Sequence, residues 1–135
     1  ASAGLLTPQM VLAAWPQAAF DAKSVSDALT AAVGGADTAD SGDIMIKAPD
    51  IAENGAVVPV TVSTGMGGVE SISILADQNA TPLTSSFNLA GNTVPFVSTR
   101  IKMGKTANVI AVVKSGGKLY SAKKEVKVTI GGCGG

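Results

Sequence analysis

The residue with the clearest chemical potential is Cys133, the only cysteine in the 135 residues, which lies within the last five residues, GGCGG. One cysteine cannot form a disulfide within its own chain, and the sequence contains no histidine. The missing histidine argues against a zinc site, a Cys–His nucleophile and a Ser–His–Asp triad. No cation within GGCGG favours the thiolate, so the pattern indicates an attachment point that active sites of other proteins must activate.

The glycines on both sides of Cys133 predict a flexible arm. Glycine adds no side chain to a core and gives the backbone its greatest freedom. At roughly 3.3 to 3.6 Å per extended residue, the thiol lies up to about 10 Å from the end of the last predicted strand. Such an arm could present an attached group to several catalytic pockets, although an engineered tag or a disordered scar would have the same sequence. The predicted arm glycines are Gly131, Gly132, Gly134 and Gly135.

Other candidate sites are weaker. The glycine-rich segment 65–68 (GMGG) lacks a following helix and a Lys-Ser/Thr pair, which argues against a phosphate loop. The four methionines are dispersed, which favours core or turn positions over a metal site. Asp50 and Glu53 could form a carboxylate pair, but they adjoin Pro49 and are typical of a solvated turn. We therefore predict no catalytic residue, no metal site and no cofactor.

Composition and charge exclude several classes of protein. The chain is 46% hydrophobic and 15% charged, which is typical of a globular domain, and no apolar run approaches the roughly 18 residues of a membrane span. The net charge is zero and the aromatic residues Trp15 and Tyr120 are isolated, so we expect no nucleic-acid binding.

Basic residues are nevertheless concentrated late in the chain. Eight of the ten lie between Arg100 and Lys127, where Glu125 is the only acidic residue. The simpler interpretation is that exposed strand faces and turns use lysine. The alternative is a positive surface near the arm that favours anionic cargo or an acidic partner.

The first third of the chain is predicted to be helical, over residues 7–35. Thr7-Pro8 is a helix start, and Ser24 with Asp27 three residues later resembles a capping box. Gly34-Gly35 should end the second helix, and residues 36–43 then predict a polar loop.

From Ile44 the hydrophobic period changes to two, which predicts strands separated by Gly, Pro or Asn turns. The fold class is therefore mainly β: an immunoglobulin-like antiparallel β-sandwich of about seven strands with N-terminal helices. One domain is expected over residues 1–130, with the sandwich at 44–130 and the arm at 131–135. The predicted strands are 44–47, 56–63, 69–76, 83–89, 93–103, 107–113 and a last strand that follows a hairpin turn at 115–118 and ends at Ile130.

The segment 107–113 is apolar on both faces, as a central or an interface strand would be. We predict that it or its neighbours contribute to an interface with a partner protein.

Three stretches together resemble a known family: IAENGAVVPVTV (51–62), FVSTRIKM (96–103) and the terminal GGCGG. They are similar to SoxY, the carrier subunit of the bacterial thiosulfate-oxidising Sox system. The resemblance covers most of the chain from about Ile44. It implies a protein that is not an enzyme but a covalent carrier of sulfur intermediates, with Cys133 as the attachment site and the four arm glycines as a swinging arm.

The resemblance also implies partners and a location. It implies a SoxYZ complex, a heterodimer with SoxZ. It also implies transient contacts with the c-type haem enzyme SoxAX, the hydrolase SoxB and, in some systems, the sulfane dehydrogenase SoxCD. The cargo would include a cysteine S-thiosulfonate, and the location would be the periplasm after removal of a signal peptide, which the first residues ASAG fit. A disulfide-linked or non-covalent homo-oligomer is left open for the chain alone.

Two alternatives come from other classes of protein. A structural or adhesion-type β-sandwich could use Cys133 for intermolecular disulfides. A thiol oxidoreductase is the weakest alternative, because the sequence has no second cysteine to resolve a mixed disulfide.

Overall fold

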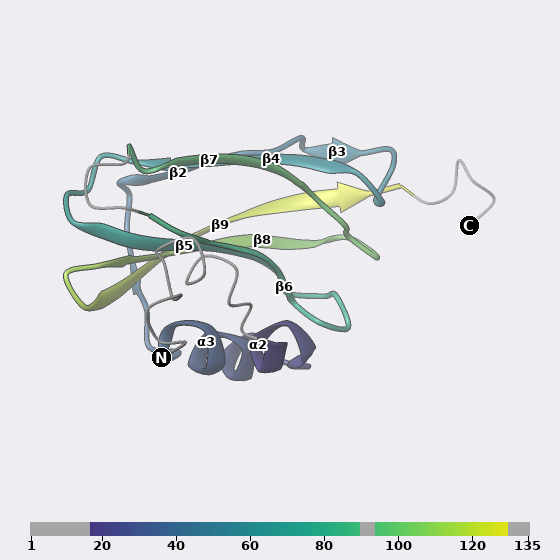
Figure 1. Ribbon diagram of the computed structural model, residues 1–135. Coiled ribbons are helices and arrows are strands. Elements are labelled where there is room, and N and C mark those ends of the chain that lie inside the picture. The colour runs from purple at the N-terminus through teal and green to yellow at the C-terminus, as the bar shows by residue number, and fades with distance from the viewer. Residues whose placement is uncertain (1–16, 90–93, 130–135) are drawn as a thin grey trace, which may run out of the picture.

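Two β-sheets pack face to face in the computed structural model, and two helices cover the outer face of the larger sheet (Figure 1). The structure describes residues 17–89 and 94–129. The hydrophobic alternation that begins at Ile44 therefore produces the predicted immunoglobulin-like β-sandwich. No helix in these two ranges is both long and apolar enough to cross a membrane.

The helical region contains α2 (Gln17–Asp21) and α3 (Val25–Val33). Ser24 caps α3 as predicted, because its hydroxyl accepts a hydrogen bond from the Asp27 amide at 3.1 Å. Gly34 ends the helix with a φ of 83°, a left-handed conformation that favours glycine, and its amide donates to Thr30 O. The helix start predicted at Thr7 lies outside the described residues.

The smaller sheet has the strand order β2-β4-β7, and the larger sheet has the order β1-β9-β8-β5-β6, with β3 also paired to β9. The bounds are β1 (Ala39–Asp40), β2 (Ile44–Lys47), β3 (Ile51–Ala52), β4 (Val58–Thr64), β5 (Val69–Ala76), β6 (Leu83–Asn88), β7 (Phe96–Ile101), β8 (Ala107–Ser115) and β9 (Lys118–Val128).

The main core lies between the two sheets. Alternate residues of β4 and β5, such as Val60 and Ile74, are almost completely buried there. A second apolar cluster lies on the other face of the larger sheet, where Leu29 of α3 packs with Leu75 and Val112. Helices α2 and α3 thus cover apolar side chains that a sheet facing water would not carry.

The two-sided apolar pattern of β8 is explained by this arrangement. Val109, Ala111 and Val113 face the core between the sheets, while Ile110 and Val112 pack with the helical layer. Segment 107–113 is therefore a central strand whose two faces are covered by its own chain. The prediction that this segment or its neighbours contribute to a partner interface stays a prediction, and the burial of these apolar side chains favours the neighbours. The large exposed apolar side chains of the described ranges lie elsewhere, at Met45, Ile51, Val57, Val94 and Phe96.

The hairpin between β8 and β9 forms as predicted. Gly116 and Gly117 have φ values of 59° and 79°, the conformation that a two-residue type I′ turn requires. The polar loop predicted at 36–43 contains the short strand β1, and the segment after Pro49 contains β3. Both pair in parallel with β9, so the sheet is not wholly antiparallel. Two-residue strands have no periodicity, which is why the sequence pattern did not reveal them.

Candidate functional site

The predicted attachment site, Cys133, and the arm glycines lie outside the described residues. The structure does describe the point at which the chain leaves the sandwich for the arm, which is the end of β9 and Thr129 (Figure 1). We call residues 127–129 the arm root. The contacts around the arm root show how far along β9 the chain is held by the sandwich.

Three consecutive backbone amides hold the arm root in place. Lys127 N donates to Asp50 O at 2.9 Å, and Thr129 N donates to Ala52 O at 3.0 Å, so β3 holds one side. Between them, Val128 N donates to Thr106 Oγ1 at 2.9 Å, from the loop that precedes β8. The chain is therefore hydrogen-bonded on alternating sides up to Thr129, four residues before Cys133.

Gly55 packs beneath the arm root. Its carbonyl accepts a hydrogen bond from Met103 N at 2.6 Å. A Cβ at position 55 would collide with the Met103 carbonyl oxygen and would lie 3.0 Å from Val128 Cγ1. Only glycine fits between these two segments without a shift of the backbone, so Gly55 sets the spacing below the arm root.

An ion pair also ties β9 to the start of β3. Lys124 Nζ lies 2.6 Å from Asp50 Oδ1, and it is the one ion pair within residues 17–89 and 94–129. The hydrogen bond and the charge of Lys124 lower the pKa of Asp50 below its ordinary value. Asp50 is thus a solvent-exposed turn residue, as predicted, but its partner is Lys124 and not Glu53.

The basic residues between Arg100 and Lys127 do not form one positive surface. Lys114 and Lys118 lie at the β8–β9 hairpin, the end of the sandwich away from the arm root. Lys102 and Lys105 lie in the β7–β8 loop, at the same end as the arm root. Lys114 and Lys118 therefore do not contribute to the charge near the arm root.

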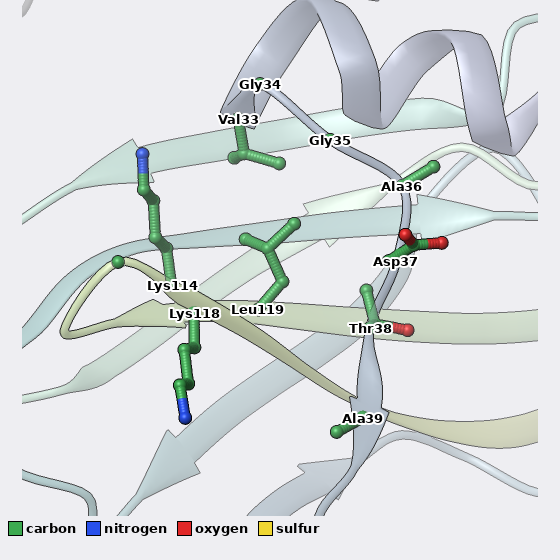
Figure 2. Close-up of a pocket in the computed structure, with 11 residues that line it drawn as sticks. Val33, Gly34, Gly35, Ala36, Asp37, Thr38, Ala39, Lys114, Lys118 and Leu119 are labelled. Atoms are coloured by element: carbon green, nitrogen blue, oxygen red, sulfur yellow. The ribbon is translucent and has the colours of Figure 1, made fainter.

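A hollow of about 710 Å³ lies at that hairpin end. It is open, and its polar side chains do not converge: Lys114 and Lys118 extend in opposite directions, and Asp37 is on a separate segment (Figure 2). Because these polar side chains do not point toward one another, the hollow does not resemble a catalytic pocket.

The weaker sequence candidates occupy structural positions. GMGG at 65–68 is the turn between β4 and β5, and Ser115 Oγ donates to Gly67 O at 2.6 Å. Met103 is buried in the core and Met45 is exposed, while no group of three potential metal ligands occurs among the described side chains. Tyr120 packs against the core, and Trp15 lies outside the described ranges.

Sequence reasoning missed the residues around the arm root. Nothing in one sequence shows that Gly55 approaches Met103, 48 positions later. The sequence also does not indicate that Thr106 contacts the arm root, because this residue lies in a short polar loop without a recognisable pattern. The short β3 pairing to β9 could have been suspected only from the apolar Ile51-Ala52 pair.

Comparison with known proteins gives a consistent result. The family model for sulfur oxidation protein SoxY matches residues 29–133, a range that ends at the cysteine. The solved structure of the sulfur carrier protein SoxY from Chlorobium limicola f thiosulfatophilum is 47% identical in sequence. It covers 85% of this chain and 100% of its own, with a TM-score of 0.71. No curated protein matches this chain.

The fold and the sequence together define an immunoglobulin-like β-sandwich with a cysteine in a glycine-rich segment beyond its last strand. The match to the family model extends over most of the chain and includes Cys133. The chain therefore belongs to the SoxY family of sulfur oxidation proteins.

Proposed function

We propose that this protein is a covalent carrier of sulfur intermediates in thiosulfate oxidation, with Cys133 as its attachment site. One observation carries the proposal: the match to SoxY extends to residue 133, and this residue is the only cysteine of the chain. The solved relative is itself described as a sulfur carrier protein. Cys133 thus combines the family match with the only thiol of the chain, the group that can form a sulfur–sulfur bond to the cargo.

The proposed loading step is an oxidation. The Cys133 thiol and thiosulfate form a sulfur–sulfur bond, which gives a cysteine S-thiosulfonate and releases one proton and two electrons. A c-type haem enzyme, SoxAX, accepts the electrons. In the next step, water attacks the terminal sulfonate sulfur, the bond between the two outer sulfurs breaks, and SoxB releases sulfate while a persulfide stays on Cys133.

The described structure supports this role through the position at which the chain leaves the sandwich. The sandwich is hydrogen-bonded up to Thr129. Four extended residues beyond this point span roughly 13 to 14 Å, so Cys133 could enter the pocket of another protein while the sandwich stays outside. We propose Gly131, Gly132, Gly134 and Gly135 as the residues that give this arm its freedom.

The wider assembly is also a proposal. Membership of the SoxY family supports partners within the Sox system, and we propose that these are SoxZ, in a heterodimer, and SoxAX, SoxB and SoxCD, in transient contacts. We propose that the complex works in the periplasm, where exported proteins meet thiosulfate and c-type haem enzymes. Exposed apolar side chains outside β8, such as Met45 and Phe96, are candidates for the SoxZ interface.

Intact-mass measurement tests the proposal. The protein, as its complex with SoxZ, is incubated with thiosulfate and the oxidising haem enzyme. We expect one added thiosulfate-derived group per chain, and none in Cys133→Ser. Absence of the added group in the parent protein, or its persistence in Cys133→Ser, contradicts the proposed function.

A further inference from the structure

A second hollow lies at the same end of the sandwich as the arm root. It has a volume of about 490 Å³ and is formed by the β5–β6 turn and the β7–β8 loop. Since β8 is antiparallel to both β5 and β9, the end of β5, the start of β8 and the end of β9 lie at the same end of the larger sheet (Figure 1). Its lining residues are Gln78, Asn79, Ala80, Thr81, Lys102, Gly104 and Lys105, and we call this hollow the lysine pocket.

The walls of the lysine pocket are joined by one side chain. Asn79 Nδ2 donates to Lys102 O at 2.7 Å, and Asn79 Oδ1 accepts from Gly104 N at 3.0 Å. The backbone amide of Asn79 also donates to Ala76 O at 3.1 Å, at the end of β5. Asn79 therefore fixes the β7–β8 loop against the β5–β6 turn, so the two segments form a shaped surface.

The pocket carries uncompensated positive charge. Lys102 and Lys105 are exposed, and neither has an ion-pair partner within the described ranges. The carboxylate of Asp77, which directly precedes Gln78, accepts hydrogen bonds from Asn108 N at 2.9 Å and Asn108 Nδ2 at 3.2 Å. Within the described ranges it forms no ion pair with either lysine.

The pocket also lies next to the arm root. Thr106, which accepts the hydrogen bond from Val128 N, directly follows Lys105. Cys133 is four residues beyond Thr129, a length of roughly 13 to 14 Å when extended, and this segment leaves the sandwich beside the loop that contains Lys105 and Thr106.

We propose that the lysine pocket binds a small sulfur oxyanion through Lys102 and Lys105. Two ammonium groups provide charge-assisted hydrogen bonds to a sulfonate or thiosulfate, and Gln78 and Thr81 add neutral donors. The oxyanion is either free in solution or the outer end of a group attached to Cys133. The second source rests on the proposed function, whereas the first does not.

Binding of an oxyanion that is free in solution is tested by amide chemical shifts in the folded protein. Thiosulfate is titrated at constant ionic strength, with chloride as the matched anion. We expect saturable shifts at Asn79, Gly104 and Lys105, and their loss in Lys102→Gln/Lys105→Gln. The control variant Lys114→Gln/Lys118→Gln removes the same charge at the far end of the sandwich and should keep the shifts.

The tethered source is tested without any partner enzyme. The Cys133 thiolate attacks a central sulfur of tetrathionate, a new sulfur–sulfur bond forms, and thiosulfate leaves, so the cysteine S-thiosulfonate is installed directly. A methyl disulfide, made with methyl methanethiosulfonate, is the neutral control. We expect the anionic group to shift the same three amides and the methyl group not to do so.

Amide shifts that depend on Lys102 and Lys105, in either experiment, support the lysine pocket and identify its source of oxyanion. The proposal is overturned if neither free thiosulfate nor the S-thiosulfonate shifts these amides. It is also overturned if the methyl disulfide shifts them equally, or if Lys114→Gln/Lys118→Gln abolishes the shifts as completely as Lys102→Gln/Lys105→Gln. Amide spectra of each variant without ligand confirm that it is folded. Since the adduct is installed chemically, failure of this test leaves the enzymatic loading of Cys133 unaffected, and the reverse also holds.

Discussion

At the scale of single residues, Gly55 shows how a missing side chain positions the arm root. The Met103 carbonyl occupies the place where a Cβ would lie, and Val128 packs on the other side. The residue is not in a left-handed conformation, so its requirement for glycine comes from this close approach and not from its backbone angles.

We expect Gly55→Ala to lower the free energy of unfolding by about 1 to 3 kcal/mol, the usual range for overpacking. Urea denaturation measures this change. Gly65→Ala is the matched control, because a Cβ there has no atom within 4 Å and Gly65 has no positive φ. Equal stability of Gly55→Ala and the parent protein would show that the contact with Met103 relaxes freely.

Thr106 stabilises the arm root through its hydroxyl oxygen, which accepts the hydrogen bond from Val128 N. Replacing it by valine keeps the branched shape but removes the acceptor for Val128 N. Loss of one such hydrogen bond is worth about 1 kcal/mol, so we expect roughly fivefold faster hydrogen exchange at the Val128 amide in Thr106→Val. The buried Val112 amide serves as the internal reference. An unchanged Val128 rate would mean that Thr106 does not hold the arm root.

At the scale of elements, β9 connects the whole structure to the arm. It pairs with β8 along its length, with β1 near its start and with β3 at its end. The pairing with β3 lies directly before the arm, so the arm starts from a strand that is held on both sides.

The Lys124–Asp50 ion pair at this position predicts a dependence of stability on pH. Because the pKa of Asp50 is lowered in the folded protein, the charged carboxylate stabilises the fold above its ordinary value of 3.8. This contribution is lost as the pH falls through the lowered pKa.

We therefore expect Asp50→Asn to have a lower melting temperature than the parent protein at pH 7, and a similar one well below pH 3.8. The difference at pH 7 should shrink in high salt, because both groups are exposed to solvent. Thermal unfolding followed by circular dichroism at both pH values checks this. A difference that stays constant across the pH range would exclude the ion pair as its cause.

Elements with strong periodicity could be predicted from the sequence, and short ones could not. The capped start of α3, the strand β5 and the Gly116-Gly117 hairpin all follow from local patterns. In contrast, β1 and β3 are two-residue strands whose pairing depends on β9, at a distance in sequence that no local pattern encodes. The same limit applies to the site: GGCGG stands out in the sequence, whereas the residues that hold the arm root are brought together only by folding.

At the scale of the whole molecule, the sandwich has two packed apolar layers. Its main core joins the two sheets, and the helical layer covers the far side of the larger sheet. The proposed carrier role requires this body to keep its shape while the group on Cys133 reacts with partner enzymes.

Because Cys133 lies outside the core, we expect a substitution in the core to lower the stability of the fold without preventing the loading of Cys133. Ile74 is fully buried between the sheets, so Ile74→Ala should lower the free energy of unfolding by about 2 to 5 kcal/mol. Met45→Ala, at a side chain that is 58% exposed, should stay within about 0.5 kcal/mol. In the fraction of Ile74→Ala that stays folded, loading of Cys133 should still occur. Loss of loading in folded protein would show that the core and the arm are coupled.

The most direct test of the carrier account is to locate the sulfur within the chain. After enzymatic loading with thiosulfate, trypsin cleavage after Lys127 releases a peptide of residues 128–135 that contains Cys133. Tandem mass spectrometry of this peptide should place one thiosulfate-derived group on Cys133 and leave every other peptide unmodified. An unmodified 128–135 peptide after loading with active SoxAX, or sulfur on another residue, would contradict the account.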